Sequence, residues 1–123
     1  MLDRTHYPAQ GCPLDELLRL LGRQWTPHIL WFLGQDGPTR FGALRRRLGG
    51  ISAKVLTERL RALEEAGVID REQTETIPPQ VTYSLTTRGQ QLARALDGLE
   101  SVAAQWHQPL ACRESSTGLP GDE

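Results

Sequence analysis

The stretch RFGALRRRLGGISAKVLTERLRALEEAG, residues 40–67, decides the fold of this chain. Apolar residues recur in it at helical spacing twice, before and after the glycine pair at 49 and 50, where we expect a tight turn. Thr39 is the predicted N-cap of the first helix, and Ser52 is that of the second, which spans residues 52–66. Two short helices joined by a tight glycine-containing turn form a helix-turn-helix.

The second helix of this pair has two different sides. Successive residues lie about 100° apart around a helix, which gathers the apolar residues on one side. These are Val55, Leu56, Leu60, Ala62, Leu63 and Ala66. Lys54, Thr57 and Arg61 lie on the opposite side. We expect them to face the major groove of DNA, because their side chains suit base edges and phosphates.

Charge is distributed unevenly along a chain whose net charge is only −1. Residues 38–63 hold seven lysine and arginine residues against one glutamate, whereas residues 64–75 hold five acids against one arginine. A basic segment of this kind indicates an anion-binding face, with phosphate as the usual partner. The alternative is a solvated face whose arginines pair with nearby acids.

The arginines of the motif are expected to have two different roles. Those at 45, 46 and 47 should contact the DNA backbone, which supplies affinity and register without sequence information. Arg59 lies on the inward side of the second helix, so its guanidinium should pair with a carboxylate or with helix-end carbonyls. The residues expected at DNA are Arg40, Arg45, Arg46, Arg47, Ser52, Ala53, Lys54, Thr57, Arg61 and Gln80.

After residue 67 the periodicity becomes that of strands. Residues 81–85 alternate apolar and polar side chains, as in a half-buried strand, and residues 68–73 are a weaker strand candidate. Pro78 and Pro79 cannot donate ladder hydrogen bonds, so we place them at the tip of a hairpin. The expected fold is mainly α with a small β-hairpin, a winged helix-turn-helix.

Two further helices are expected before the motif. The spacing of four leucines predicts a helix between Pro13 and Gly22. The next helix should begin near Thr26, a candidate N-cap followed by Pro27. Its centre, residues 29–33, is apolar on every side, which requires burial all round in a core or in a subunit interface.

A long C-terminal helix is expected from about Thr86 to Trp106. Its apolar residues are spaced four, three, four and three apart, which suits packing along a second helix. They are Leu92, Leu96, Leu99, Ala103 and Trp106. We expect this stripe to form a homodimer interface; the alternative is that it covers only its own domain. The expected domain, residues 12–108, lies between an N-terminal arm (1–11) and a disordered polar tail (109–123).

Composition limits the class of protein. A length of 123 residues favours a single domain. No apolar run approaches the roughly 20 residues of a membrane span, and the N-terminus lacks a signal-peptide pattern, so we expect a cytoplasmic protein without membrane association. Cys12 and Cys112 match no metal-ligand spacing, and the histidines lie in no catalytic pattern. We therefore expect no metal, no cofactor and no enzyme activity.

Five stretches together resemble the HxlR family of bacterial winged helix-turn-helix transcriptional regulators, relatives of the MarR type. They are CP, GRQWTPHILW, RFGALRRRLGGIS, LTERLRALEEAGVIDR and IPPQVTYSLTTRG. The resemblance implies a homodimer that binds double-stranded operator DNA and responds to a small-molecule, electrophile or redox signal. It also implies a basic residue after the double proline, where this chain has Gln80, and a lysine at Gln24.

Cys12 is the candidate for the redox signal, since some members of the resembled family sense oxidants or electrophiles through a cysteine at this place. If Pro13 is the first helical residue, Cys12 is at the N-cap, where free N–H groups and the helix dipole favour a thiolate. The alternative is a cysteine packed as a small hydrophobe.

Two other interpretations stay open. A winged helix can serve a protein partner instead of DNA, and DNA affinity that does not respond to salt would then be expected. An effector pocket between the apolar helix, the C-terminal helix and the wing would be lined by Trp25, Trp31, Phe32 or Trp106. These aromatic residues can equally belong to the core and to an interface.

Overall fold

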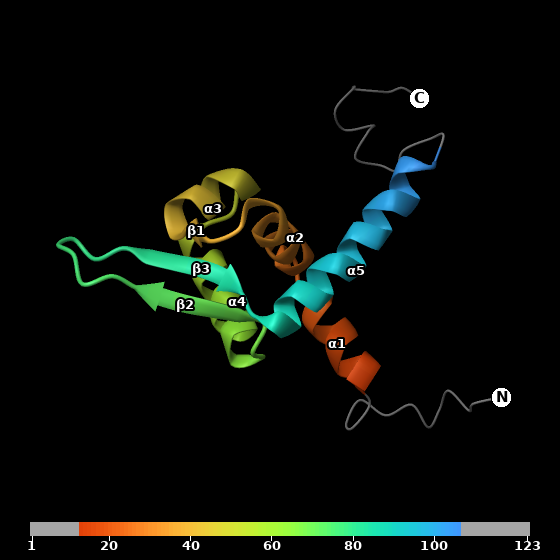
Figure 1. The fold of residues 1–123 in the computed structure, drawn as a ribbon, viewed down its shortest axis with the longest axis horizontal. Coiled ribbons are helices and arrows are strands. Elements are labelled where there is room, and N and C mark those ends of the chain that lie inside the picture. The colour runs from red at the N-terminus through yellow and green to blue at the C-terminus, as the bar shows by residue number, and fades with distance from the viewer. Residues whose placement is uncertain (1–12, 107–123) are drawn as a thin grey trace.

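The computed structural model describes residues 13–106, which form five helices and a three-stranded antiparallel sheet (Figure 1). The elements are α1 (Pro13–Leu21), α2 (Thr26–Asp36), β1 (Thr39–Arg40), α3 (Phe41–Leu48), α4 (Ala53–Glu65), β2 (Ile69–Gln73), β3 (Val81–Leu85) and α5 (Thr87–Ala104). The expected fold class, mainly α with a small hairpin, is confirmed. The N-terminal arm, Cys12 and the tail at 109–123 lie outside the described residues.

The turn between α3 and α4 forms as the sequence predicts. Gly49 and Gly50 both have positive φ, 62° and 95°, a backbone conformation that residues with a Cβ rarely adopt. Ser52 then caps α4, because its hydroxyl accepts a hydrogen bond of 3.1 Å from the backbone N–H of Val55. The cap fixes where α4 begins.

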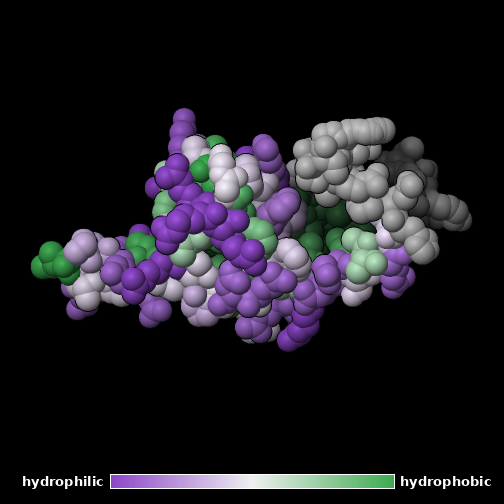
Figure 2. Space-filling model, turned by 90° about the horizontal axis from the view of Figure 1, so that it is seen from above, coloured by the Kyte–Doolittle hydropathy of each residue, from purple (hydrophilic) through white to green (hydrophobic). Residues whose placement is uncertain are grey.

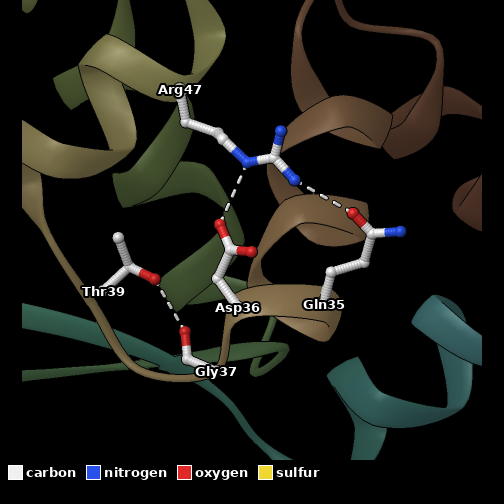
Figure 3. A network of polar contacts seen from close by, with 5 residues as sticks. All are labelled: Gln35, Asp36, Gly37, Thr39 and Arg47. Atoms are coloured by element: carbon white, nitrogen blue, oxygen red, sulfur yellow. Dashed lines mark hydrogen bonds and ion pairs between the residues drawn. The ribbon is translucent and has the colours of Figure 1, made fainter.

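The prediction that Thr39 caps α3 is wrong. Thr39 lies in the short strand β1, where it pairs with Tyr83 of β3, and Arg40 is the residue that precedes α3. The Thr39 hydroxyl instead donates to the carbonyl oxygen of Gly37 across 2.7 Å (Figure 3). Pairing with β3 draws Thr39 into the sheet, whose strand order is β1-β3-β2.

The predicted N-cap of α2 is displaced by one residue. Trp25 occupies the cap position, with a left-handed backbone of φ 78°, and Thr26 is already helical. The carbonyl oxygen of Trp25 accepts the hydrogen bond from the N–H of Ile29, 2.9 Å away. This is the first hydrogen bond of the helix, so Thr26 is a residue of α2 and not its cap. Its side chain is buried.

The core lies between α2, α4 and the sheet. Its buried members include Ile29, Leu30 and Leu33 of α2, Leu44 and Leu48 of α3, Leu56, Leu60 and Leu63 of α4, and Val68, Ile69 and Tyr83. Trp31 and Phe32 are only half-buried, so one side of α2 is left incompletely covered within the chain. The burial all round that was expected for residues 29–33 is therefore reached within one chain by Ile29, Leu30 and Leu33 but not by Trp31 and Phe32.

The hairpin and α5 extend from opposite sides of this core (Figure 1). β2 and β3 pair from Ile69↔Leu85 to Gln73↔Val81, and Pro78 and Pro79 lie in the turn between them, which confirms their predicted place. Leu92 and Leu96 of α5 pack against the core, whereas Leu99 further along is exposed. Within residues 13–106, no helix is both long and apolar enough to cross a membrane.

Candidate nucleic-acid interface

The three consecutive arginines of α3 have different surroundings. Arg47 turns toward α2, where its Nε donates to Asp36 and its Nη2 to Gln35, both at 3.1 Å (Figure 3). Its guanidinium also lies 4.2 Å from the ring centre of Phe32. Arg45 Nε donates to the carbonyl oxygen of Ile51 across 3.0 Å and so braces the α3–α4 turn. Arg46 is exposed, and its side chain makes no hydrogen bond or ion pair within residues 13–106.

Arg59 has the structural contact that the sequence predicts. Its side chain is half-buried, and its Nε donates to the carbonyl oxygen of Gln24, in the turn between α1 and α2, across 2.8 Å. The partner is a backbone carbonyl of a turn, neither a carboxylate nor a helix-end carbonyl, so the structural role is as predicted and the kind of partner is not. Arg59 therefore points away from the surface that carries Lys54 and Arg61.

Four basic side chains expected at DNA remain open to solvent. Arg40, Arg46, Lys54 and Arg61 are exposed, and the described part of the chain holds no hydrogen-bonding or ion-pairing partner for any of their side chains. Their charges are thus available to an external anion. Figure 2 views the molecule from the α3 side, and hydrophilic residues are gathered near the centre of that view.

Two adjoining grooves form the surface around these cations. One, of about 560 Å³, lies over the α3–α4 turn and is lined by Arg45, Arg46 and the capping Ser52. The other, of about 620 Å³, lies between α4 and the hairpin and is lined by Thr57, Arg61 and Arg71. Phe41 borders both grooves, which places them side by side. Arg71 was not among the expected residues, although it is the one cation in the strand that follows α4.

The remaining predicted residues lie at the two ends of this surface. Ala53 and Lys54 form the exposed first turn of α4, beside the helix N-terminus, whose free N–H groups and dipole attract anions. Gln80 lies at the base of the hairpin turn, where its backbone N–H donates to Thr74 Oγ1 and its carbonyl accepts from the Thr74 N–H. Glu64 and Glu65 lie at the opposite end of α4 from Ala53.

Of the four aromatic residues named for an effector pocket, only Trp31 lines the pocket of about 270 Å³ between α2 and α5. A pocket of about 360 Å³ does lie between α2, β3 and α5, but Leu33, Leu85, Ala93 and Arg94 are among its lining residues, and none of the four aromatics is. The indole N–H of Trp31 donates to Asp97, a lining residue of the 360 Å³ pocket, across 3.2 Å. Within residues 13–106, no cluster of histidine, cysteine or acidic residues is arranged to hold a metal ion.

Comparison with known proteins identifies close relatives along most of the chain. The model of the HxlR-like helix-turn-helix family matches residues 20–111. A protein of Fusobacterium mortiferum named as the regulatory protein MalR is 36% identical over 97 residues, which are 79% of this chain and 92% of that protein. The HTH-type transcriptional regulator YtfH of Escherichia coli is 40% identical over 91 residues, 74% of this chain and 71% of the relative.

Solved structures of similar fold are also transcriptional regulators. The reduced form of the transcriptional regulator YodB from B. subtilis matches with a TM-score of 0.66 at 33% identity, covering 79% of this chain and 95% of that one. Its diamide-treated and quinone-bound forms match with TM-scores of 0.62 and 0.65, both at 32% identity, covering 81% and 77% of this chain and 99% of each structure. These relatives are regulators and not enzymes, and this chain accordingly belongs to the HxlR-like helix-turn-helix family of transcriptional regulators.

Proposed function

We propose that this regulator binds double-stranded operator DNA as a homodimer, with the N-terminal half of α4 in the major groove. The observation that carries the proposal is the division of α4 into two sides. Leu56, Leu60 and Leu63 are buried in the core, while Lys54 and Arg61 are exposed and without partners among the described residues. A helix held this way presents cations to DNA at no cost to packing.

The surface beside α4 suits the phosphate backbone. Arg40 and Arg46 offer uncommitted charges, and the first turn of α4 adds backbone N–H groups and a small residue, Ala53, that permits close approach. Arg47 contributes less to this surface, because its guanidinium is already engaged by Asp36 and Gln35. We therefore assign the backbone contacts of α3 to Arg46 first and to Arg45 second.

The homodimer is supported by apolar surface that one chain leaves uncovered. Helix α1 has no buried residue, with Leu14 and Leu18 50% and 56% exposed. Leu99 of α5 is 64% exposed, and Trp106, two residues after the end of that helix, is 48% exposed. A groove between α2 and α5, lined by Trp31, Leu96 and Leu99 among others, continues this surface. Apolar patches of this extent mark interaction sites, and a second copy gives two DNA-binding surfaces related by two-fold symmetry.

A signal role for Cys12 completes the proposal. Cys12 directly precedes Pro13, the first residue of α1, and we propose that the free N–H groups and dipole of that helix N-terminus favour its thiolate. Relatives support the assignment, since structures of YodB exist in reduced, diamide-treated and quinone-bound forms. We propose that an oxidant or electrophile that modifies Cys12 changes DNA binding by this regulator.

Selection from a random pool of DNA duplexes tests the function directly. We expect enrichment of an inverted repeat, with half-sites about one helical turn apart, as two-fold symmetry requires. Lys54→Ala should weaken binding to the selected duplex while leaving the fold intact. If no sequence is enriched above the starting pool, the proposal fails, and the alternative, a winged helix that binds a protein partner, is favoured.

A further inference from the structure

The hairpin separates its charges by face. Successive residues of a strand point to opposite sides of the sheet, so Ile69, Arg71 and Gln73 of β2 share one face. Ile69 is buried in the core, which identifies that face as the one turned toward the helices. Asp70 and Glu72 therefore lie on the other face. Although β2 is acidic overall, its helix-facing side carries a cation, Arg71.

Arg71 enters a cleft that it shares with the DNA-facing side of α4. Thr57 and Arg61 from α4 and Arg71 from β2 all line the cleft of about 620 Å³ between α4 and the hairpin, and neither Asp70 nor Glu72 does. Arg71 pairs in register with Tyr83, the central residue of the sheet. Tyr83 is buried in the core, which holds its backbone in place. Pairing with Tyr83 therefore fixes the backbone of Arg71 as well.

A neutral side chain positions the guanidinium of Arg71, so its positive charge is not neutralised. Its Nη2 donates to the amide oxygen of Gln73 across 3.1 Å, and it makes no ion pair with any carboxylate of residues 13–106. Glu64 also lines the cleft but forms no ion pair with Arg61 or Arg71. Two cations thus face one carboxylate, which leaves the cleft with a net positive charge.

We propose that this cleft binds a phosphate of the DNA backbone, held between Arg61 and Arg71. Arg71 then supplies the cation of the wing from strand β2, in a chain that has Gln80 after the double proline. A guanidinium suits this role because its planar fork can hold two oxygens of one phosphate. The cleft also has apolar walls, Pro79 and Val81, against which the sugar next to that phosphate can pack.

A phosphate contact has a signature that separates it from a base contact. It adds affinity for every sequence equally, and its loss reduces the slope of log affinity against log salt by roughly 0.9. This inference rests on the proposed function, since it requires DNA on the surface of α4. The test must therefore distinguish a protein that does not bind DNA from one that binds without Arg71.

The experiment measures the affinity of full-length protein for a selected duplex and for a scrambled duplex over a range of salt. We expect Arg71→Ala to lower both affinities by the same factor and the salt slope by roughly 0.9. Arg71→Lys should keep the slope and lose part of the affinity. Glu64→Gln should act in the opposite sense and tighten binding to both duplexes, because it removes the carboxylate from the cleft.

The control is Arg94→Ala, which removes an exposed arginine of α5 that has no partner among residues 13–106. Arg94 lies outside this cleft, so the variant should leave the slope unchanged. The inference is overturned if Arg71→Ala and Arg94→Ala give the same slope while Lys54→Ala still weakens binding; the proposed function then survives without it. A loss confined to the selected duplex would also overturn it, since Arg71 would then contact a base. If the wild-type protein binds neither duplex, both proposals fall together.

Discussion

The Nε of Arg59 lies 2.8 Å from the carbonyl oxygen of Gln24, which joins α4 to the turn between α1 and α2. The two residues are 35 positions apart in the sequence. Arg61, two residues further along α4, is exposed and has no such partner in the described chain. One arginine of α4 thus fixes the helix within the domain while its neighbour stays available to DNA.

Replacing Arg59 should therefore lower stability and not specificity. Arg59→Ala removes one charge-assisted hydrogen bond at a half-buried site, and we expect the free energy of unfolding to fall by about 1 kcal/mol. Urea denaturation without DNA measures this loss. Arg61→Ala, the matched control, should leave the unfolding midpoint unchanged and weaken DNA binding. The reverse pattern would show that the two arginines have exchanged roles.

Arg46 and Arg47 are adjacent in the sequence and should behave differently. Arg47→Ala removes the contacts with Asp36 and Gln35 and the stacking on Phe32, so the unfolding midpoint in urea should decrease. Arg46→Ala should leave that midpoint unchanged and reduce the salt slope of DNA binding by roughly 0.9. An equal effect of both variants on DNA binding would contradict the assignment of Arg47 to α2.

Two glycines of α5 give a matched test of how closely this helix approaches the core. A Cβ on Gly89 would overlap the carbonyl oxygen of Val68, whereas a Cβ on Gly98 would meet nothing within 4 Å. Gly89→Ala should destabilise the protein by about 1–3 kcal/mol, the usual cost of overpacking. Gly98→Ala should be neutral or stabilise by up to about 1 kcal/mol, because alanine favours helix. Thermal unfolding distinguishes them, and equal midpoints would mean that α5 sits further from Val68.

The dimer interface is tested at a residue that the fold of the single chain does not need. Leu99 is 64% exposed, so Leu99→Asp should leave the folded chain intact and split the homodimer, as measured by sedimentation. Ser101→Asp places the same charge about 200° further around α5 and should leave the dimer unchanged. If Leu99→Asp sediments like the wild-type protein, the contact between copies lies on other residues.

The signal role of Cys12 is tested by comparing wild type with Cys12→Ser before and after treatment with diamide or a quinone. The wild-type protein should change its affinity for the selected duplex on treatment, because a thiolate reacts with both reagents. Cys12→Ser should bind DNA normally and show no change. An equal response of the two proteins would leave Cys12 a packing role.

Features governed by neighbouring residues were predictable from the sequence. The Ser52 cap and the turn at Gly49 and Gly50 depend on side chains and backbone within a few positions, and the structure confirms them. The two-sided character of α4 follows from helical periodicity alone, which is why the inward role of Arg59 was correctly predicted.

Features governed by residues far apart in the chain could not be predicted from the sequence. Thr39 looks like an N-cap until Tyr83, 44 positions away, pairs with it in the sheet. The surroundings of Arg45, Arg46 and Arg47 differ because Ile51 and Asp36 happen to lie beside two of them in space. Arg71 could not be predicted for a related reason: the acidic segment 70–75 separates into two faces of different charge only when strand β2 pairs with β3.

The salt dependence of DNA affinity tests the central claim most directly. For a duplex selected from a random pool, the logarithm of the association constant should fall linearly with the logarithm of salt concentration, with a slope of roughly −0.9 for each phosphate neutralised. Arg40, Arg46 and Arg61, which have no partner in the described chain, and Arg71, which forms no ion pair there, predict a slope that corresponds to several phosphates per copy. A slope near zero would contradict DNA binding through α3, α4 and the hairpin.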